Sequence, residues 1–205
     1  MIVLGLTGSI AMGKSTTAAM FRDLGVPVHD SDETVHRLYE GPAAPLIEAR
    51  FPGTTKSGRV DRRLLSQRVL KDPQAMAELE AIVHPLVRQD EEAFLEAARS
   101  AGEPLIVLDI PLLFESGATD RVDAVVVVSA SPEIQRQRAL ARPGMTEEKF
   151  EAILRRQVPD ETKRLKADFV IDTSHGLAHA KAQVAAIRDR ILAGDGNRAK
   201  RSGKS

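Results

Sequence analysis

Short apolar runs alternate with amphipathic stretches along most of the chain, and the runs end at glycine or polar residues. The runs are rich in β-branched side chains and only a few residues long, which predicts strands. Runs that are apolar throughout are typical of strands buried on both faces of a parallel sheet. The predicted strands are residues 2–6, 26–29, 105–110, 122–128 and 169–171.

Helical spacing of apolar residues separates most of these runs. We predict helices over residues 14–24, from Pro132 through Arg138, over 147–157 and over about 177–192. Ser131 and Thr146 precede two of them as N-cap residues, because a side-chain oxygen there accepts a free N–H of the first turn. Strands alternating with helices predict an α/β fold built on a doubly wound parallel sheet.

The segment from about Thr34 to Ala101 has a different pattern, mostly helical and interrupted by Gly-Pro and Pro-Gly pairs. We predict a helical insertion there, with amphipathic stretches over residues 64–70 and 76–87. Taken alone, His84 before Pro85 favours the end of a helix. Leu112 and Leu113 alone favour plain core positions.

Composition excludes several classes of function. Lys plus Arg and Asp plus Glu both number 29 in the 205 residues, so no global field favours nucleic acid or an anionic membrane. The chain has no cysteine, and its first apolar run has no basic leader, so we expect a cytoplasmic protein. We expect no nucleic-acid, membrane or obligate protein partner, and a disordered basic tail over residues 194–205.

The loop after the first strand carries the strongest motif. Residues 8–15 read G-S-I-A-M-G-K-S, which satisfies G-x-x-x-x-G-K-[ST] between a strand and a helix. Its backbone N–H groups surround phosphate, Lys14 reaches the β and γ oxygens, and the Ser15 hydroxyl ligates Mg²⁺. The predicted ATP-binding residues are Gly8, Ser9, Ile10, Ala11, Met12, Gly13, Lys14, Ser15 and Thr16, with Mg²⁺ as cofactor.

The rest of the chain favours a kinase over a GTPase. No Asn-Lys pair occurs, so the N-K-x-D element that reads guanine is missing. Asp30 and Asp32 follow the second strand, at the sheet edge where ligands bind. Asp32 is our candidate base for an acceptor hydroxyl, and each aspartate can instead cap the next helix.

Two further features fit a phosphoryl transferase. Asp109 ends the most apolar strand, where a carboxylate can hold Mg²⁺. Arginines 136, 138 and 142 lie on a helix and loop broken by Pro143-Gly144, as in a lid that neutralises the transferring phosphate. Arg136 and Arg138 cannot share a helix face, and Arg142 beside the break is the first choice.

Together these motifs resemble the bacterial dephospho-CoA kinase family, over residues 2–192. The resemblance rests on L-T-G-x-x-x-x-G-K-S-T, D-x-D at 30–32, G-R-V-D-R at 58–62, His84-Pro85 and D-I-P-L-L-F-E at 109–115. It implies transfer of the ATP γ-phosphate to the ribose 3′-hydroxyl of dephospho-CoA, which completes coenzyme A. It also implies a nucleotide-binding core (1–32 and 104–193), a CoA-side helical insertion (33–103) and a lid (131–158).

The resemblance assigns further residues. It implies Asp32 as base, Arg138 and Arg142 as lid arginines, and an acceptor site formed by Asp32, His84, Leu112, Phe114 and Glu115. Family loops usually read Gly-Gly-Ile-Gly-Ser-Gly-Lys, whereas here Ser9, Ala11 and Met12 replace two glycines and a serine. If Ala11 adopts positive φ it is strained, and the cradle then differs slightly.

A second departure concerns the adenine. The family often carries Asn after the last strand, where this chain has Asp172-Thr173. Two other functions stay open from the residues: a kinase for another nucleoside or nucleotide, and a regulatory module that binds ATP without transfer.

Overall fold

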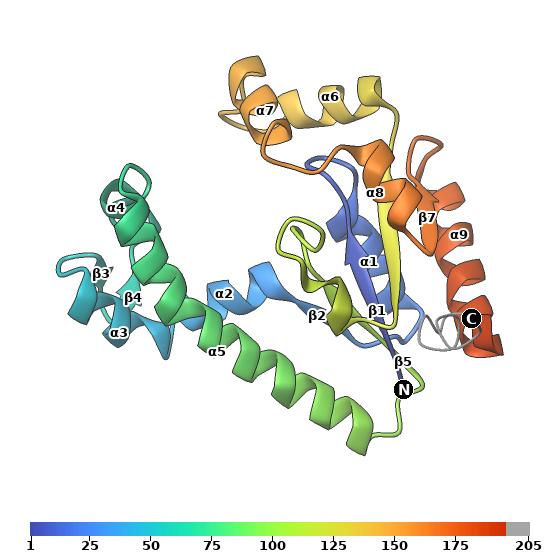
Figure 1. Cartoon of the computed structure of the whole chain (residues 1–205), viewed down its shortest axis with the longest axis horizontal. Helices are drawn as coiled ribbons and strands as arrows, with labels where there is room; N and C mark the ends of the chain where they lie inside the picture. Colours follow the sequence, from blue (N-terminus) through green and yellow to red (C-terminus); the bar gives the residue numbers. More distant parts are fainter. Residues whose placement is uncertain (196–205) are drawn as a thin grey trace. The chain divides into compact units, whose positions relative to one another are not determined.

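The computed structural model describes residues 1–195, and the predicted tail beyond residue 195 lies outside that range. Its central sheet has the strand order β2-β5-β1-β6-β7 (Figure 1). The pairs β1–β5, β1–β6 and β6–β7 are parallel, which confirms the predicted parallel α/β fold. The strands are β1 (Ile2–Thr7), β2 (Val28–Asp30), β5 (Leu105–Asp109), β6 (Ala124–Ser129) and β7 (Phe169–Asp172).

Every residue of β5 and β6 is buried, as their apolar sequences require. Leu6, Phe21 and Val126 are fully buried in the main core, which also takes in α9 through Val184. The helices of this part are α1 (Lys14–Asp23), α6 (Pro132–Leu140), α7 (Glu147–Leu154), α8 (Asp160–Lys166) and α9 (Leu177–Arg190), with the shorter η1 (Ala118–Arg121) and η2 (Ile191–Asp195).

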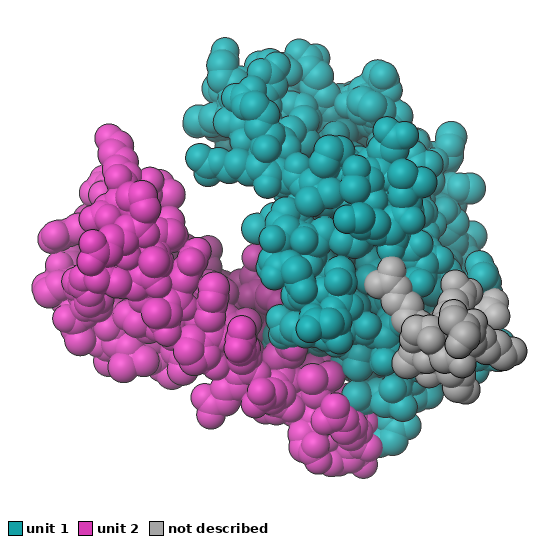
Figure 2. Space-filling model, viewed as in Figure 1, with its two compact units in different colours: residues 1–29, 101–205 teal, residues 30–100 magenta. Residues whose placement is uncertain are grey.

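The chain divides into two compact units, residues 1–29 with 101–205 and residues 30–100 (Figure 2). The second unit is helical apart from one hairpin, and Leu38, Ile47 and Leu65 are buried in its core. Its elements are α2 (Ser31–Tyr39), α3 (Ala43–Arg50), β3 (Thr55–Lys56), β4 (Arg59–Val60), α4 (Arg62–Val69) and α5 (Pro73–Ser100).

Three local expectations were wrong or incomplete. His84 does not end a helix, because the 28-residue helix α5 continues through Pro85 to Ser100. The hairpin β3–β4 was not predicted; its turn has positive φ at both Ser57 and Gly58, as the type I′ two-residue hairpin loop requires. Helix α8 was also missed, since its exposed leucine, Leu165, gives no apolar stripe to detect.

The predicted N-caps are confirmed. The Ser131 hydroxyl accepts the N–H of Ile134 at the start of α6, and the Thr146 hydroxyl accepts that of Lys149 in α7. Gly194 and Asp195, the first two residues of the predicted tail, are the last two residues of η2. Over residues 1–195, no helix has the length and apolar character needed to cross a membrane.

Candidate active site

The phosphate loop connects β1, the middle strand of the sheet, to α1. Two of its glycines are required by geometry: a Cβ at Gly8 would lie 2.7 Å from the Val128 carbonyl oxygen, and Gly13 has φ 98°. Ala11 has a positive φ of 62°, which is the strained conformation considered for this residue from the sequence. The first N–H groups of α1 have no intrahelical acceptor and therefore offer an anion site.

Lys14 of this loop forms an ion pair with Asp109. Its Nζ lies 2.5 Å from Oδ1 of the aspartate, which is fully buried at the end of β5. The side chain of Lys14 is 14% exposed, so the ammonium is largely shielded from solvent. Two residues predicted separately, one for phosphate and one for metal, therefore meet at the carboxyl edge of neighbouring strands.

A cavity of about 320 Å³ opens beside the loop. Five parts of the chain line it: the loop, α1, α6 with the residues after it, the segment after β7, and α9. Of the residues predicted from sequence, the cavity brings together Ala11, Gly13, Thr16, Arg138 and Arg142. The remaining lining residues are Thr17, Met20, Thr173, Gly176, Leu177 and Ala180.

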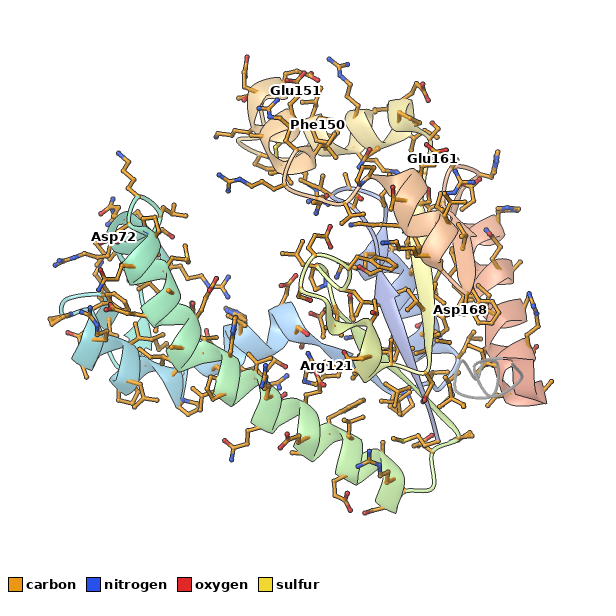
Figure 3. The ribbon with its side chains drawn as sticks, in the orientation of Figure 1. Asp72, Arg121, Phe150, Glu151, Glu161 and Asp168 are labelled. Atoms are coloured by element: carbon orange, nitrogen blue, oxygen red, sulfur yellow. The ribbon has the colours of Figure 1, made fainter. Side chains whose placement is uncertain are left out.

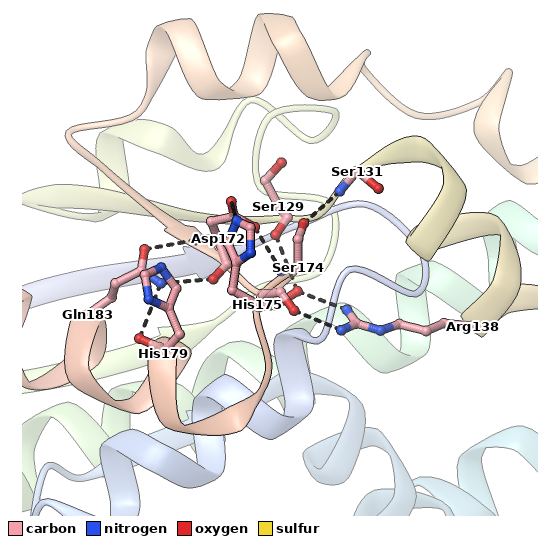
Figure 4. A network of polar contacts seen from close by, with 9 residues as sticks. Ser129, Ser131, Arg138, Asp172, Ser174, His175, His179 and Gln183 are labelled. Carbon is pink, nitrogen blue, oxygen red and sulfur yellow. Dashed lines mark hydrogen bonds and ion pairs between the residues drawn. The ribbon is translucent and has the colours of Figure 1, made fainter.

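Arg138 reaches from α6 to the segment after β7 (Figure 4). Its guanidinium donates to both the hydroxyl and the carbonyl oxygen of Thr173, each at 2.8 Å. The same hydroxyl lies 2.8 Å from the carbonyl oxygen of Met12 in the phosphate loop. Thr173, one of the two residues noted as a departure from the family pattern, thus links a predicted lid arginine to the loop.

The other two predicted lid arginines, Arg136 and Arg142, have different surroundings. Arg136 is exposed and forms an ion pair with Glu147 at 2.5 Å, and this contact raises the pKa of Arg136. Arg142 is also exposed, but it lines the cavity. Arg136 and Arg138 point to different partners, as their spacing on one helix predicted.

Glu115 is held within its own unit. Its Oε1 accepts the N–H of Val158 at 2.9 Å and lies 2.8 Å from Nζ of Lys163, whose side chain is fully buried. Burial alone would raise the pKa of Glu115, but Lys163 and the backbone N–H groups lower it below its ordinary value. The carboxylate thus ties the loop after β5 to the segment between α7 and α8.

The neighbouring hydrophobic residues are not all core. Leu113 is fully buried, as expected from sequence alone, whereas Leu112 is 48% exposed and Phe114 is partly exposed. Leu112 was therefore wrongly interpreted as plain core. An exposed leucine next to a buried one leaves an apolar side chain available for contact with a ligand.

Asp30 and Asp32 have distinct surroundings in the second unit. The Asp30 carboxylate caps α2 by accepting the N–H groups of Asp32 and Glu33 at 2.9 and 3.0 Å, so the capping interpretation holds for Asp30. Asp32 lies in the first turn of α2 with an exposed side chain. His84, on α5, is exposed as well.

The site offers oxygen donors for one metal ion. Ser15 presents an exposed hydroxyl in the first turn of α1, close in sequence to Lys14, which holds Asp109. Among residues 1–195, no three acidic, histidine or cysteine side chains are grouped to hold a metal by themselves. The Ser15 hydroxyl and the Asp109 carboxylate are oxygen donors of the kind that Mg²⁺ takes, and this ion commonly keeps water and phosphate oxygens as its other ligands.

The comparison with known sequences decides the family. A sequence model described as Dephospho-CoA kinase matches residues 2–179. The chain belongs to the dephospho-CoA kinase family. Dephospho-CoA kinases catalyse the final step of CoA biosynthesis with ATP, and the resemblance first noted in the motifs is confirmed.

Relatives cover nearly the whole chain. A dephospho-CoA kinase of Mesorhizobium japonicum is 66% identical over 191 residues, which are 93% of this chain and 97% of the relative. A crystal structure from Thermus thermophilus has a TM-score of 0.81 at 36% identity, covering 94% of this chain and 98% of its own. Dephospho-CoA kinase from Campylobacter jejuni has a TM-score of 0.72 at 27% identity, with the same coverage.

Several residues in this dephospho-CoA kinase site were not found from the sequence. Gln135 and Gln157 contact the phosphate loop, and Lys163 contacts Glu115. None of them belongs to a motif with a chemical signature. Thr173 was noted only as a departure, although its contacts with Arg138 and Met12 place it at the centre of the polar network.

Proposed function

We propose that this chain transfers the γ-phosphate of ATP to the ribose 3′-hydroxyl of dephospho-CoA, giving coenzyme A and ADP. The observation that carries the proposal is the family match over residues 2–179, combined with an intact phosphate loop whose Lys14 is held by a buried aspartate. The geometry favours phosphoryl transfer because positioning and charge neutralisation supply most of its catalysis.

We propose the following roles on the ATP side. The loop residues Gly8–Thr16 and the N-terminus of α1 bind the phosphates, and Lys14 moves from Asp109 toward the β and γ oxygens when nucleotide binds. Arg142, exposed and lining the cavity, neutralises charge on the transferring group. Arg138 is already bound to Thr173, and this supports a role in shaping the wall of the same cavity.

On the acceptor side, Asp32 is proposed to accept the proton of the 3′-hydroxyl as the new oxygen–phosphorus bond forms and ADP leaves. Its exposed carboxylate, with no capping role of its own, supports this assignment. His84, Leu112 and Phe114 are proposed to contact dephospho-CoA. Glu115 is proposed to act through the loop that carries Leu112 and Phe114, since its carboxylate already has partners.

We further propose that Ser15 and Asp109 hold Mg²⁺, Asp109 directly or through water. When bound, the ion supplies positive charge that shields the β- and γ-phosphates. We also propose that the reaction takes place in the cytoplasm. The expected lack of nucleic-acid, membrane and obligate protein partners remains a prediction.

The decisive experiment measures ADP release with ATP and Mg²⁺ in the presence of dephospho-CoA, and separately with adenosine, AMP, CMP or pantothenate. We expect turnover with dephospho-CoA and a product with the mass of coenzyme A. Turnover with only one of the other acceptors would support a kinase activity but would reject dephospho-CoA as the acceptor. Release of ADP that no acceptor stimulates would favour a module that binds ATP without transfer.

A further inference from the structure

Both backbone groups of Ile10, in the phosphate loop, are bound by glutamine side chains far away in sequence. The Ile10 N–H donates to Gln157 Oε1 at 3.0 Å, and Gln135 Nε2 donates to the Ile10 carbonyl oxygen at 2.8 Å. Gln135 is a buried residue of α6, and Gln157 follows α7. The amide orientations are fixed, because a backbone N–H can only donate and a carbonyl can only accept.

The next residue is the strained one. Ala11 has φ 62°, a conformation that an L-residue rarely adopts without support from its surroundings. Ala11 is 6% exposed and packs with Ala139 of α6 and Phe150 of α7, the latter labelled in Figure 3. Ile10 lies against the same small cluster. Gln135 of α6 and Gln157 after α7 therefore hydrogen-bond the loop at Ile10, and α6 and α7 pack against it at Ala11.

We propose that Gln135 and Gln157 are positioning residues that hold the phosphate loop, through Ile10, in the conformation that strained Ala11 requires. The conformation at residues 10 and 11 sets the direction of the loop N–H groups that follow, so its loss misplaces the donors for the triphosphate. A glycine at position 11 adopts the same φ without strain and needs no such support. The inference rests on the proposed function, since it concerns the same ATP site.

The test is a double-mutant cycle between each glutamine and Ala11. Gln157→Met and Gln135→Met remove one hydrogen bond each at similar volume, and Gln137→Met, on an exposed position of α6, is the matched control. Each variant is also made with Ala11→Gly. Thermal unfolding reports whether each protein folds, and calorimetric titration with Mg²⁺ and ATP, without acceptor, reports binding.

We expect both single glutamine variants to bind ATP about threefold to tenfold more weakly, as one neutral hydrogen bond implies. Gln137→Met should stay within about twofold of the wild type, the scatter expected for a surface change. In the Ala11→Gly background the loss should shrink to within about twofold, because the glycine removes the strain that the glutamines offset. Unchanged ATP affinity in both single variants, or an equal loss in both backgrounds, would overturn the proposal.

Buried Gln135 is the position whose substitution most endangers folding, and if that variant fails to fold, partly exposed Gln157 decides the outcome alone. Failure of the proposed function is separable from failure of this inference. If the wild type does not phosphorylate dephospho-CoA, the acceptor assignment fails while the ATP-binding cycle still gives its answer. If the wild type phosphorylates dephospho-CoA but ATP affinity shows no coupling between the glutamines and Ala11, only the positioning role of the glutamines fails.

Discussion

Replacing Glu115 by Gln should lower the free energy of unfolding by more than breaking an exposed ion pair does. The Lys163 side chain is fully buried and its ammonium lies 2.8 Å from Glu115 Oε1, whose side chain is 14% exposed. Glu115→Gln is nearly isosteric and leaves the Val158 N–H an oxygen acceptor, but it leaves the buried ammonium without a countercharge. Breaking a buried pair in this way costs about 3–5 kcal/mol.

Thermal unfolding followed by circular dichroism measures this cost. For a chain of this length about 1 kcal/mol shifts the melting temperature by roughly 2–4 °C, so the expected decrease is about 6–20 °C. The double variant Glu115→Gln with Lys163→Met removes both charges and should lose less than Glu115→Gln alone. A double variant whose losses simply add would refute the argument that the unpaired buried charge causes the cost.

The exposed pair of Arg155 and Glu151 is the matched control. Their side chains are 69% and 57% exposed, and the pair spans one helical turn. Arg155→Gln should cost at most about 0.5 kcal/mol, and that cost should vanish at high salt. The effect of Glu115→Gln should persist at high salt, since a buried pair is screened much less.

The pKa of Glu115 adds a test by pH. Because its folded pKa is lowered, the stabilisation from the ionised carboxylate is complete above the unfolded pKa of about 4.3 and is lost as pH falls through the folded value. The difference in unfolding free energy between wild type and Glu115→Gln should therefore narrow at acid pH. A constant difference across that range would contradict the assigned pKa direction.

Three further changes test the site and the loop. Asp32→Asn should lower kcat by about 10²- to 10⁴-fold in steady-state assays while calorimetry shows nearly unchanged ATP affinity; retained turnover would remove Asp32 as base. Arg142→Ala should lower kcat about tenfold to a hundredfold, whereas Arg136→Ala should have little effect; equal losses of kcat in the two variants would refute the proposal that Arg142 in particular neutralises charge on the transferring phosphate. Gly8→Ala should lower thermal stability by about 1–3 kcal/mol by overpacking against β6, whereas Gly41→Ala should be nearly neutral; the reverse order would refute the close-approach argument.

Much of the fold could be predicted because burial on both faces leaves a clear sequence pattern. Strands β5 and β6 are apolar at almost every position, and Ser131 and Thr146 mark helix starts by local hydrogen bonds. The missed elements lack such signals. The strands β3 and β4 have two residues each, and α5 tolerates Pro85 where local preference favours an end.

The candidate site divides in the same way. The position of Lys14 and Ser15, in the first turn of α1 directly after the loop that follows β1, could be predicted because both belong to one contiguous motif. Gln157 could not, since its partner in the loop lies 147 residues away and a glutamine on a polar segment carries no chemical signature. Arg138 was predicted to be a lid arginine, but its hydrogen bonds to Thr173 depend on where the fold places α6 and the segment after β7. Contacts of this kind follow from tertiary packing, which local sequence does not encode.

Ala11 shows how a departure from the family's usual loop can leave the phosphate site intact. The positive φ of an L-residue costs about 1–2 kcal/mol. Burying its methyl group against Ala139 and Phe150 offsets about 0.8 kcal/mol, and each hydrogen bond to Ile10 contributes about 0.5–1.5 kcal/mol. These contributions are of the same size as the strain, and all of them come from α6, α7 and Gln157. An alanine is therefore tolerated in this loop for as long as those elements stay packed against it, which makes the loop conformation depend on the segment that carries Arg138 and Arg142.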